Sequence, residues 1–359
     1  MTQTARQSRG QPFTILTVVG ARPQFVKAAA VSRALRGQSG MRELLVHTGQ
    51  HFDREMSALF FEELELPEPV RNLEIGGGSH GAMTGRMLAA LETAMTGFAP
   101  DAVLVYGDTN STLAGALAAA KLAIPVIHVE AGLRSNRRSQ PEEINRVVAD
   151  RLSTMLLCPT RAAIANLERE NVPGEIRHVG DVMYDATLFA LERVRDRLAP
   201  LDRLGLRDRN YAVATLHRAE NVDDGDRLRR LVDYLRTEAK EQPVVLPLHP
   251  RTRERLSRFD VDTTGLLLTS PLGYLEMTRL LAGAAHLFTD SGGMQKEAYF
   301  HRVPCTTLRD ETEWVETVEA GWNRLWQGGP RTGQREIADY GTGTAAARAV
   351  EAIRHHFRI

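Results

Sequence analysis

One ten-residue segment, 289–298, combines a Ser-Gly-Gly turn with the start of a helical pattern, directly after an apolar run. A strand that turns into a helix at Ser291, Gly292 and Gly293 aims unpaired backbone N–H groups and the positive end of the helix dipole at an anion. Glu297, one turn into this helix, is placed to accept hydrogen bonds from ribose hydroxyls. The segment therefore predicts a phosphate-binding site for a nucleotide, although an ordinary strand-to-helix turn with a polar N-cap would use the same residues.

Three acidic residues occupy related positions in the first half of the chain. Asp108 and Glu130 each follow an apolar run typical of a buried strand, and Glu142 begins the next helical segment. Taken singly, Asp108 also fits a helix N-cap, and Glu142 also fits an acid that complements the helix dipole. Because the carboxyl ends of parallel strands share one edge of a sheet, we expect the three carboxylates to lie near one another. Carboxylates brought together raise the pKa of at least one of them, which provides an acid and a base from one residue type.

Basic residues and histidines follow other predicted strands. Arg22 comes after the first strand, and Lys27 lies a little more than one helical turn further on, so both cations can point to the same sheet edge. His217 and His249 each follow a strand in the second half, which favours a functional role for both.

Two further histidines, His286 and His301, fit ordinary structural positions. No close pair of ligands lies on one helix face, so we expect no catalytic metal.

Short β-branched runs alternate with longer helical stretches along the whole chain, which is typical of parallel strands joined by crossover helices. The predicted strands form two series. The first series is 13–19, 41–46, 102–106, 125–129 and 155–158, and the second is 211–215, 244–247, 266–269, 286–289 and 304–307. The pattern predicts an α/β protein with two doubly wound Rossmann-like domains and an active site in the cleft between them.

The domain boundaries follow from the same pattern. We expect a disordered tail at 1–10, a first domain at 11–182, a linker helix at 183–203 and a second domain at 204–341. A last helix within 342–359 is expected to join the first domain.

The composition excludes several classes of protein. The 359 residues include 45 basic and 45 acidic residues, so the formal charge is zero and favours neither a nucleic-acid nor a membrane surface. Cys158 and Cys305 lie in separate apolar segments, which favours core thiols of a reducing compartment. No apolar run has the length of a signal peptide core or a membrane span, and we expect a cytoplasmic protein.

Eight ordered motifs between about 17 and 325 resemble those of the non-hydrolysing UDP-N-acetylglucosamine 2-epimerase family. They are 20–23 (GARP), 47–51 (HTGQH), 107–109 (GDT), 128–134 (HVEAGLR), 141–146 (PEEINR), 217–221 (HRAEN), 249–250 (HP) and 290–293 (DSGG). The resemblance implies the two-domain glycosyltransferase-B architecture, with the last helix returning to the first domain. It also implies a homodimer that binds a UDP-sugar and needs no added cofactor.

The resemblance also implies roles for individual residues. The acidic catalytic set would be Asp108, Glu130 and Glu142, with the direction of each proton transfer left open. Stabilisation of the departing UDP would come from Arg22, Lys27 and His217. The remaining substrate contacts implied are those of Arg146, His249, Tyr274, Ser291, Gly292, Gly293, Glu297 and Arg309. The implied reaction eliminates UDP to form 2-acetamidoglucal and then adds it back.

Two segments depart from the common branch of the family and leave the substrate open. The sequence after the Ser-Gly-Gly turn, at 296–300, and the segment 309–316 are more similar to the branch that epimerises a UDP-2,3-diacetamido-glucuronic acid. Arg137 or Arg138 would then supply a cation for the carboxylate at C6, although both also fit surface charges. The alternatives to an epimerase of this family are a UDP-sugar glycosyltransferase, a hydrolysing epimerase and a catalytically silent UDP-sugar binding protein.

Overall fold

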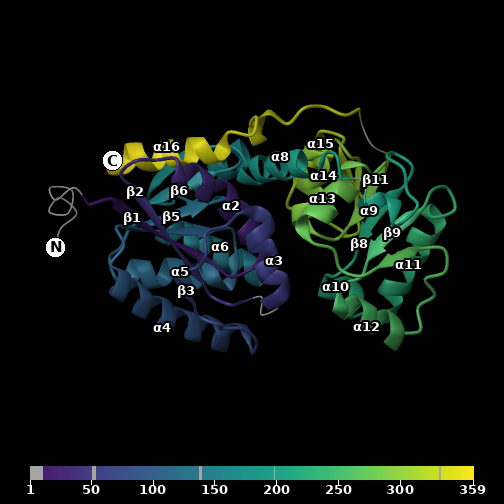
Figure 1. The fold of residues 1–359 in the computed structure, drawn as a ribbon, viewed down its shortest axis with the longest axis horizontal. Coiled ribbons are helices and arrows are strands. Elements are labelled where there is room, and N and C mark those ends of the chain that lie inside the picture. The colour runs from purple at the N-terminus through teal and green to yellow at the C-terminus, as the bar shows by residue number, and fades with distance from the viewer. Residues whose placement is uncertain (1–10, 51–53, 137–139, 198, 331–332) are drawn as a thin grey trace. The chain divides into compact units, whose positions relative to one another are not determined.

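The computed structural model describes residues 11–50, 54–136, 140–197, 199–330 and 333–359, and it divides into two compact units (Figure 1). The first unit extends to Ala186 and resumes at Ala338–Ile359, and the second is Thr187–Ile337. The tail at 1–10 lies outside the described residues, as do Arg137 and Arg138. Among the described helices, none is long and apolar enough to cross a membrane.

The described part of the first unit contains a seven-stranded parallel sheet in the order β3-β2-β1-β4-β5-β6-β7. Its strands are β1 (Phe13–Val19), β2 (Met41–His47), β3 (Arg71–Asn72), β4 (Ala102–Tyr106), β5 (Val126–Val129), β6 (Met155–Cys158) and β7 (Glu175–His178). The central strands β4, β5 and β6 are apolar except for His128 of β5, because helices cover both faces of the sheet.

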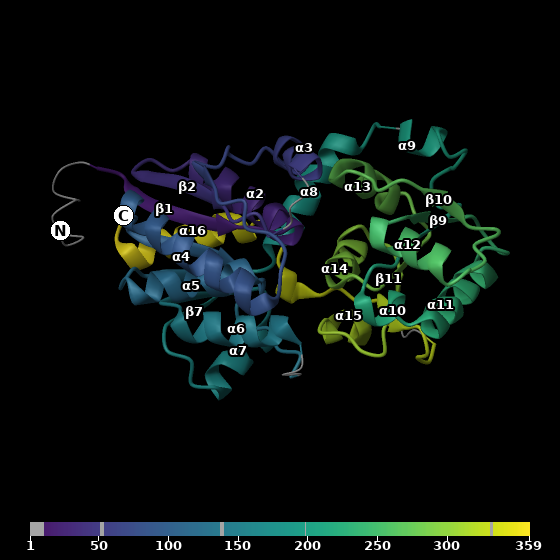
Figure 2. The same cartoon turned by 90° about the horizontal axis from the view of Figure 1, so that it is seen from below.

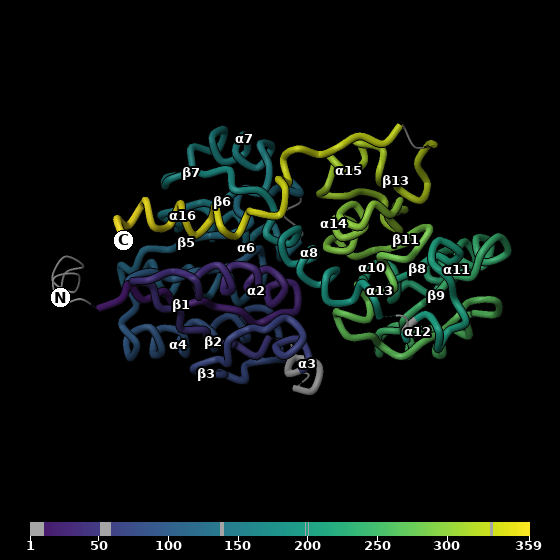
Figure 3. The backbone as a smooth tube through the Cα atoms, turned by 45° about the horizontal axis from the view of Figure 1, so that its top comes forward, coloured from purple at the N-terminus to yellow at the C-terminus, as the bar shows by residue number. Residues whose placement is uncertain are grey.

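Helices of the first unit pack against both faces of this sheet. They are α2 (Arg22–Arg36), α3 (Arg54–Leu64), α4 (His80–Phe98), α5 (Asn110–Lys121), α6 (Pro141–Leu152), α7 (Arg161–Arg169), the first part of α8 (Val182–Val194), and α16 (Ala345–Phe357). Figure 2 shows α4, α5 and α6 side by side. The last helix, α16, packs beside α2 of the same unit (Figure 3), and the rings of Phe13 and Phe357 lie 4.9 Å apart.

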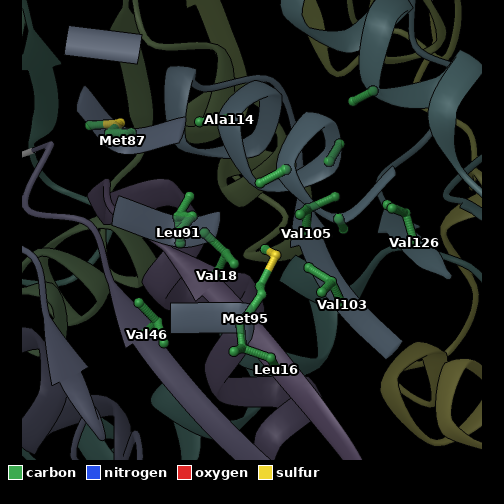
Figure 4. Close-up of a cluster of buried hydrophobic side chains, with 14 of the residues drawn as sticks. Leu16, Val18, Val46, Met87, Leu91, Met95, Val103, Val105, Ala114 and Val126 are labelled. Carbon is green, nitrogen blue, oxygen red and sulfur yellow. The ribbon is translucent and has the colours of Figure 1, made fainter. Parts of the chain in front are cut away.

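A buried apolar cluster holds α4 and α5 on the sheet of the first unit. Leu16 and Val18 of β1 meet Met87, Leu91 and Met95 of α4, and all five side chains are buried (Figure 4). Burial of one such side chain stabilises the fold by about 1.5–3 kcal/mol. The core therefore anchors the ends of β1 and β4, which lead into the loops before Arg22 and at Asp108.

The second unit repeats this architecture. Within the described residues, its six-stranded parallel sheet has the order β10-β9-β8-β11-β12-β13. The strands are β8 (Ala212–Thr215), β9 (Val244–Pro247), β10 (Leu267–Thr269), β11 (His286–Thr289), β12 (Cys305–Thr307) and β13 (Asn323–Leu325). The helices are α9 (Ala199–Asp202), α10 (Ala219–Val222), α11 (Gly225–Glu238), α12 (Pro250–Arg258), α13 (Tyr274–Ala282), α14 (Gly292–Phe300) and α15 (Val315–Glu319).

The strand order of each sheet reverses direction at one point, between β1 and β4 in the first unit and between β8 and β11 in the second. The loops after these strands diverge to opposite faces of the sheet, and the carboxyl edge beside them is where open α/β sheets bind ligands. Each unit therefore offers one topologically defined position for a ligand.

All ten predicted strands are present, with ends that differ by at most one residue. Three strands escaped prediction, namely β3, β7 and β13. Each lies at an edge of its sheet, and β3 and β7 carry charged or polar residues that interrupt the apolar signal. The last helix begins at Ala345, three residues after the start of the predicted range.

Candidate active site

The loop after β1 is fixed to the end of β4 by one buried side chain. The amide oxygen of Gln24 accepts hydrogen bonds from the backbone N–H groups of Gly20 and Ala21, at 2.8 and 3.1 Å. Its amide nitrogen donates to the carbonyl of Tyr106 at 3.1 Å. Arg22 begins α2 directly after this loop and is partly exposed, with its guanidinium 5.6 Å from the centre of the Phe60 ring.

Lys27 and Glu130 form a buried ion pair at the same edge of the sheet. Lys27 lies on α2, and Glu130 follows β5 with a left-handed backbone, φ +67°. The pair closes against Gly107, because a Cβ atom on that glycine would lie 3.1 Å from Glu130 Oε2 and 3.2 Å from Lys27 Nζ. Gly107 has φ +61°, so glycine suits both its backbone and the space beside it.

Asp108, the next residue after Gly107, pairs with Arg146 of α6. Arg146 is buried and also donates to Glu143 at 3.0 Å, and Asn145 of the same helix donates to the carbonyl of Asp108 at 2.9 Å. Thr109, and not Asp108, is the N-cap of α5. The carboxylate of Asp108 is therefore not used for capping and faces α6.

Glu142 is exposed near the start of α6, one turn before Arg146. Glu130 lies beside Gly107 and Asp108 directly follows it in the chain, and each of the two acids forms an ion pair with a cation. The expectation that the three carboxylates lie near one another at this edge did not include the bases Lys27 and Arg146, which pair with two of them. Glu143, the neighbour of Glu142, is the buried acid of this helix and accepts hydrogen bonds from the backbone N–H groups of Ser135 and Asn136.

In the second unit, His217 pairs with the buried Asp290. The two follow the neighbouring strands β8 and β11, and Nδ1 of His217 lies 2.9 Å from Oδ1 of Asp290. The backbone N–H groups of His217 and Arg218 both donate to Asp290 at 2.9 Å. Burial opposes ionisation of Asp290, but the charge of His217 and these hydrogen bonds hold its pKa below the usual value. The side chain of His217 itself is exposed.

His249 is the N-cap of α12 and accepts a hydrogen bond from the backbone N–H of Arg251 at 3.3 Å. Its ring is exposed and lies 6.5 Å, between centres, from the ring of His217. The two histidines therefore share the carboxyl edge of the second sheet.

Ser291 is the N-cap of α14, and Gly292 and Gly293 are its first helical residues. A Cβ atom on Gly292 would collide with the carboxylate of Glu313. Gly292 was predicted to be part of a phosphate-binding turn, and in the structure an acid of the chain lies beside that position. Arg309 is buried and donates to Glu313 at 2.9 Å. Burial opposes ionisation of Glu313, but Arg309 holds its pKa below the usual value.

Glu297 is partly buried one turn into α14, and burial raises the pKa of its carboxyl to about 7, with Lys296 limiting the rise. Lys296 is fully buried, with its ammonium 4.0 Å from the centre of the Trp314 ring. Tyr274 is buried at the start of α13, which follows the β10 loop.

His286 and His301 take structural positions. His286 forms a hydrogen bond of 2.9 Å with Thr306 on the neighbouring strand, and burial lowers the pKa of His301 to about 4. Across the described residues, no group of three or more His, Cys, Asp or Glu side chains could hold a metal ion.

Gln24, Asp290 and Glu313 are three polar residues that the sequence analysis did not single out. Gln24 and Asp290 are buried and Glu313 is partly buried, and each contacts a loop at the carboxyl edge of its sheet. Asp290 belongs to the 290–293 motif and directly follows a buried strand, and this position was the signal that could have identified it as a site residue. Gln24 and Glu313 gave no signal, because only the folded chain shows which backbone groups they contact.

Two doubly wound units with polar loops at both strand-order reversals define a protein of the two-domain, Rossmann-like glycosyltransferase-B class. This confirms the predicted fold class. A profile of the UDP-N-acetylglucosamine 2-epimerase family matches residues 33–354. The chain belongs to that family, as its motifs predicted, and family members are isomerases.

Three similar proteins illustrate the relationship. The UDP-2,3-diacetamido-2,3-dideoxy-D-glucuronate 2-epimerase of Pseudomonas aeruginosa is 51% identical over 315 residues, 87% of each chain. A UDP-N-acetylglucosamine 2-epimerase homolog of Methanococcus maripaludis is 50% identical over 317 residues, 87% of this chain and 88% of the relative. The crystal structure of Methanocaldococcus jannaschii UDP-GlcNAc 2-epimerase in complex with UDP-GlcNAc and UDP has a TM-score of 0.85 and 39% identity, and covers 95% of this chain and 99% of that one.

Proposed function

We propose that this protein interconverts UDP-N-acetylglucosamine and UDP-N-acetylmannosamine by eliminating UDP and adding it back. The observation that carries the proposal is the arrangement around Gly107, where Asp108 and the Lys27–Glu130 pair meet at the carboxyl edge of the first sheet. Two carboxylates held by separate loops can serve two faces of one sugar carbon.

The chemistry explains why acids and cations are both needed. The C2 proton has no adjacent carbonyl, so the C1–O bond breaks first and its electron pair leaves with UDP. A carboxylate then takes the C2 proton, and the electrons of the C2–H bond form the C1=C2 double bond of 2-acetamidoglucal. In the return step a proton adds to the opposite face of C2 while a UDP oxygen attacks C1. No electron is gained or lost overall.

Asp108, Glu130 and Glu142 would divide the proton transfers. The buried ion pair of Glu130 and the half-buried ion pair of Asp108 support this role, because Lys27 and Arg146 hold the two carboxylates in place. Lys27 and Arg22 would also stabilise the negative charge that develops on the departing diphosphate.

The second unit would hold the nucleotide. Ser291, Gly292 and Gly293 at the start of α14 would bind phosphate, and Glu297 would accept hydrogen bonds from the ribose. His217, with the buried Asp290 behind it, would donate to the diphosphate as charge develops. The remaining contacts would come from His249, Arg309 and, near the uracil, Tyr274.

A second substrate is supported by one specific comparison. The Pseudomonas aeruginosa relative at 51% identity is named as acting on UDP-2,3-diacetamido-2,3-dideoxy-D-glucuronate. The same elimination and addition at C2 would epimerise this sugar. The cation for its C6 carboxylate, assigned in the sequence analysis to Arg137 or Arg138, lies outside the described residues.

Proton NMR in heavy water tests the proposal. Purified protein is given each of the two UDP-sugars separately, and an epimerase will place deuterium at C2 of both epimers while UDP stays attached at equilibrium. A glycosyltransferase will leave C2 unlabelled, and a hydrolysing enzyme will release one UDP for each free sugar. Absence of exchange with both sugars would overturn the proposed function. The faster of the two exchange reactions identifies the preferred substrate.

The homodimer and the cytoplasmic location expected from the sequence stay predictions. Sedimentation velocity at micromolar concentration tests the first, and fractionation of the source cells tests the second.

A further inference from the structure

His128 is buried in the middle of the first unit and contacts an oxygen atom with each ring nitrogen. It lies on β5, two residues before Glu130. Nδ1 lies 2.7 Å from a carboxylate oxygen of Asp150 on α6, and Nε2 lies 2.7 Å from the backbone carbonyl oxygen of Gly107. Both distances are those of well-formed hydrogen bonds.

The two partners fix the protonation of the ring. A backbone carbonyl only accepts hydrogen bonds, and an ionised carboxylate also only accepts. Asp150 is held as an acceptor by Arg134, at 2.6 Å, and by the backbone N–H of Gly132, at 3.2 Å. His128 must therefore donate from both nitrogens, which makes it an imidazolium.

The charged groups around Asp150 form a cluster that agrees with this assignment. The carboxylate of Asp150 is fully buried and pairs with Arg134. Arg134 also pairs with Glu170, which is partly exposed and has Arg169 as a further neighbouring cation. Arg134 is therefore shared between two carboxylates, and a protonated His128 would supply a second cation to the buried one. The Cys158 thiol is a further titratable group beside Asp150, and its pKa is raised by burial and by Asp150.

The cluster touches each loop or helix that carries one of the proposed catalytic acids. His128 donates to Gly107, directly before Asp108, and Asp150 lies on α6, which carries Glu142. Through Gly132, Asp150 also holds the turn that begins at Glu130.

The backbone of these turns has little freedom to relax. Gly107, Glu130 and Gly132 all have positive φ, of +61°, +67° and +82°. A left-handed conformation at Glu130, which is not a glycine, persists only where neighbouring groups hold it.

We propose that the His128 imidazolium, paired with Asp150, is a positioning residue that holds the three acids in the positions needed for proton transfer at C2. The catalytic role of the three acids rests on the proposed function, but the charge state of His128 does not depend on that function. His128 does not touch the reacting atoms, and its effect passes through Gly107 and Asp150.

The first test measures protonation directly in the wild-type protein. With 15N-labelled histidine, long-range proton–nitrogen spectra at pH 8 are expected to show both ring nitrogens of His128 protonated, and loss of that signal in His128→Gln assigns it. His301, buried and of low pKa, is the internal control and should be neutral in the same spectrum. A neutral His128 at pH 8 would overturn the proposal.

The second test separates positioning from mere folding. His128→Gln keeps one amide donor, whereas His128→Phe keeps none. We expect kcat to fall about 10- to 100-fold for His128→Gln with KM within about threefold, and further for His128→Phe, because misplacement of about 1 Å costs about that much. His301→Gln, a buried histidine of the other unit, should leave kcat unchanged.

Each result has a defined meaning. A lower melting temperature with unchanged kcat in His128→Gln would show a structural role only, and a change confined to KM would show a binding role. Either would overturn the inference. If wild-type protein shows no deuterium exchange at C2, the proposed function fails, whereas the spectra still report on His128.

Discussion

The ammonium group of Lys27 and the carboxylate of Glu130 form an ion pair that closes directly over Gly107. The two residues are 103 positions apart in the chain, and both are buried. A buried pair stabilises a protein little compared with an apolar pair of the same shape, whereas loss of one partner is strongly destabilising. This relationship gives the first prediction.

Lys27→Met should destabilise the protein by about 3–5 kcal/mol, because it leaves the Glu130 carboxylate buried without its cation. The double variant Lys27→Met/Glu130→Gln should regain most of this stability, since both charges are gone. Urea unfolding measures both effects. The double variant should show no deuterium exchange at C2, because the Glu130 carboxylate is missing. A double variant as unstable as Lys27→Met would contradict the pairing.

Gly107→Ala should disturb the same pair from the glycine side. The new Cβ would lie 3.1 Å from Glu130 Oε2, and the left-handed backbone adds about 1–2 kcal/mol of strain. We expect at least a tenfold fall in kcat. Gly205→Ala is the matched control, since its φ is +64° and a Cβ there meets no atom within 4 Å. It should show the backbone strain in unfolding experiments and normal kcat. Equal loss of kcat in the two variants would refute a local effect.

Asp108→Asn should abolish most proton transfer while it preserves the fold. The amide is nearly isosteric with the carboxylate and can still accept a hydrogen bond from Arg146, so we expect little change in structure. Epimerisation should fall by about 10²–10⁴-fold, the usual contribution of a general acid or base. Asp101→Asn, at the opposite end of β4, is the control and should keep full exchange at C2. Activity within threefold of wild type in Asp108→Asn would remove Asp108 from the catalytic set.

The pKa of Glu297, raised to about 7, predicts a pH-dependent stability. Between pH 4.5 and 7 the folded protein holds a proton on Glu297 that the unfolded chain has released. The folded state binds more protons, so the free energy of unfolding falls as the pH rises through this range. Glu297→Gln removes this loss. It should be close to wild type at pH 4.5 and about 2 kcal/mol more stable at pH 8, as measured by urea unfolding.

UDP binding should show the opposite dependence. In the proposed function Glu297 would accept hydrogen bonds from the ribose, and the ionised carboxylate is the better acceptor, so wild-type affinity should increase from pH 6 to pH 8. Calorimetry on Glu297→Gln should show weaker binding without this increase. In the unfolding experiment, the raised pKa would be contradicted if the free energies of unfolding of wild type and Glu297→Gln changed with pH in the same way.

The sequence was sufficient to place the strands because their signal is local. Runs such as those of β4 and β9 are apolar over their whole length, which a strand buried on both faces requires, and their ends agree with prediction. Edge strands such as β7 are half-exposed and mixed in character, so their pattern does not differ from a loop.

The site was harder to derive, since its decisive contacts join residues that are distant in the chain. Lys27, Asp108 and Glu130 could be named from their positions after strands. Their partners could not, because Arg146 for Asp108 and Lys27 for Glu130 depend on how α6 and α2 pack.

The sequence by itself determined the alternation of strands and helices, the loops that carry polar residues and the family to which the chain belongs. These features depend on hydrophobic periodicity and on short motifs, which involve neighbouring residues. The tertiary structure decided which acid meets which base, why Gly107 lacks a side chain and how His128 acquires two acceptors. Those contacts form only when the sheet brings distant strand ends to one edge, where burial fixes each charge beside its partner.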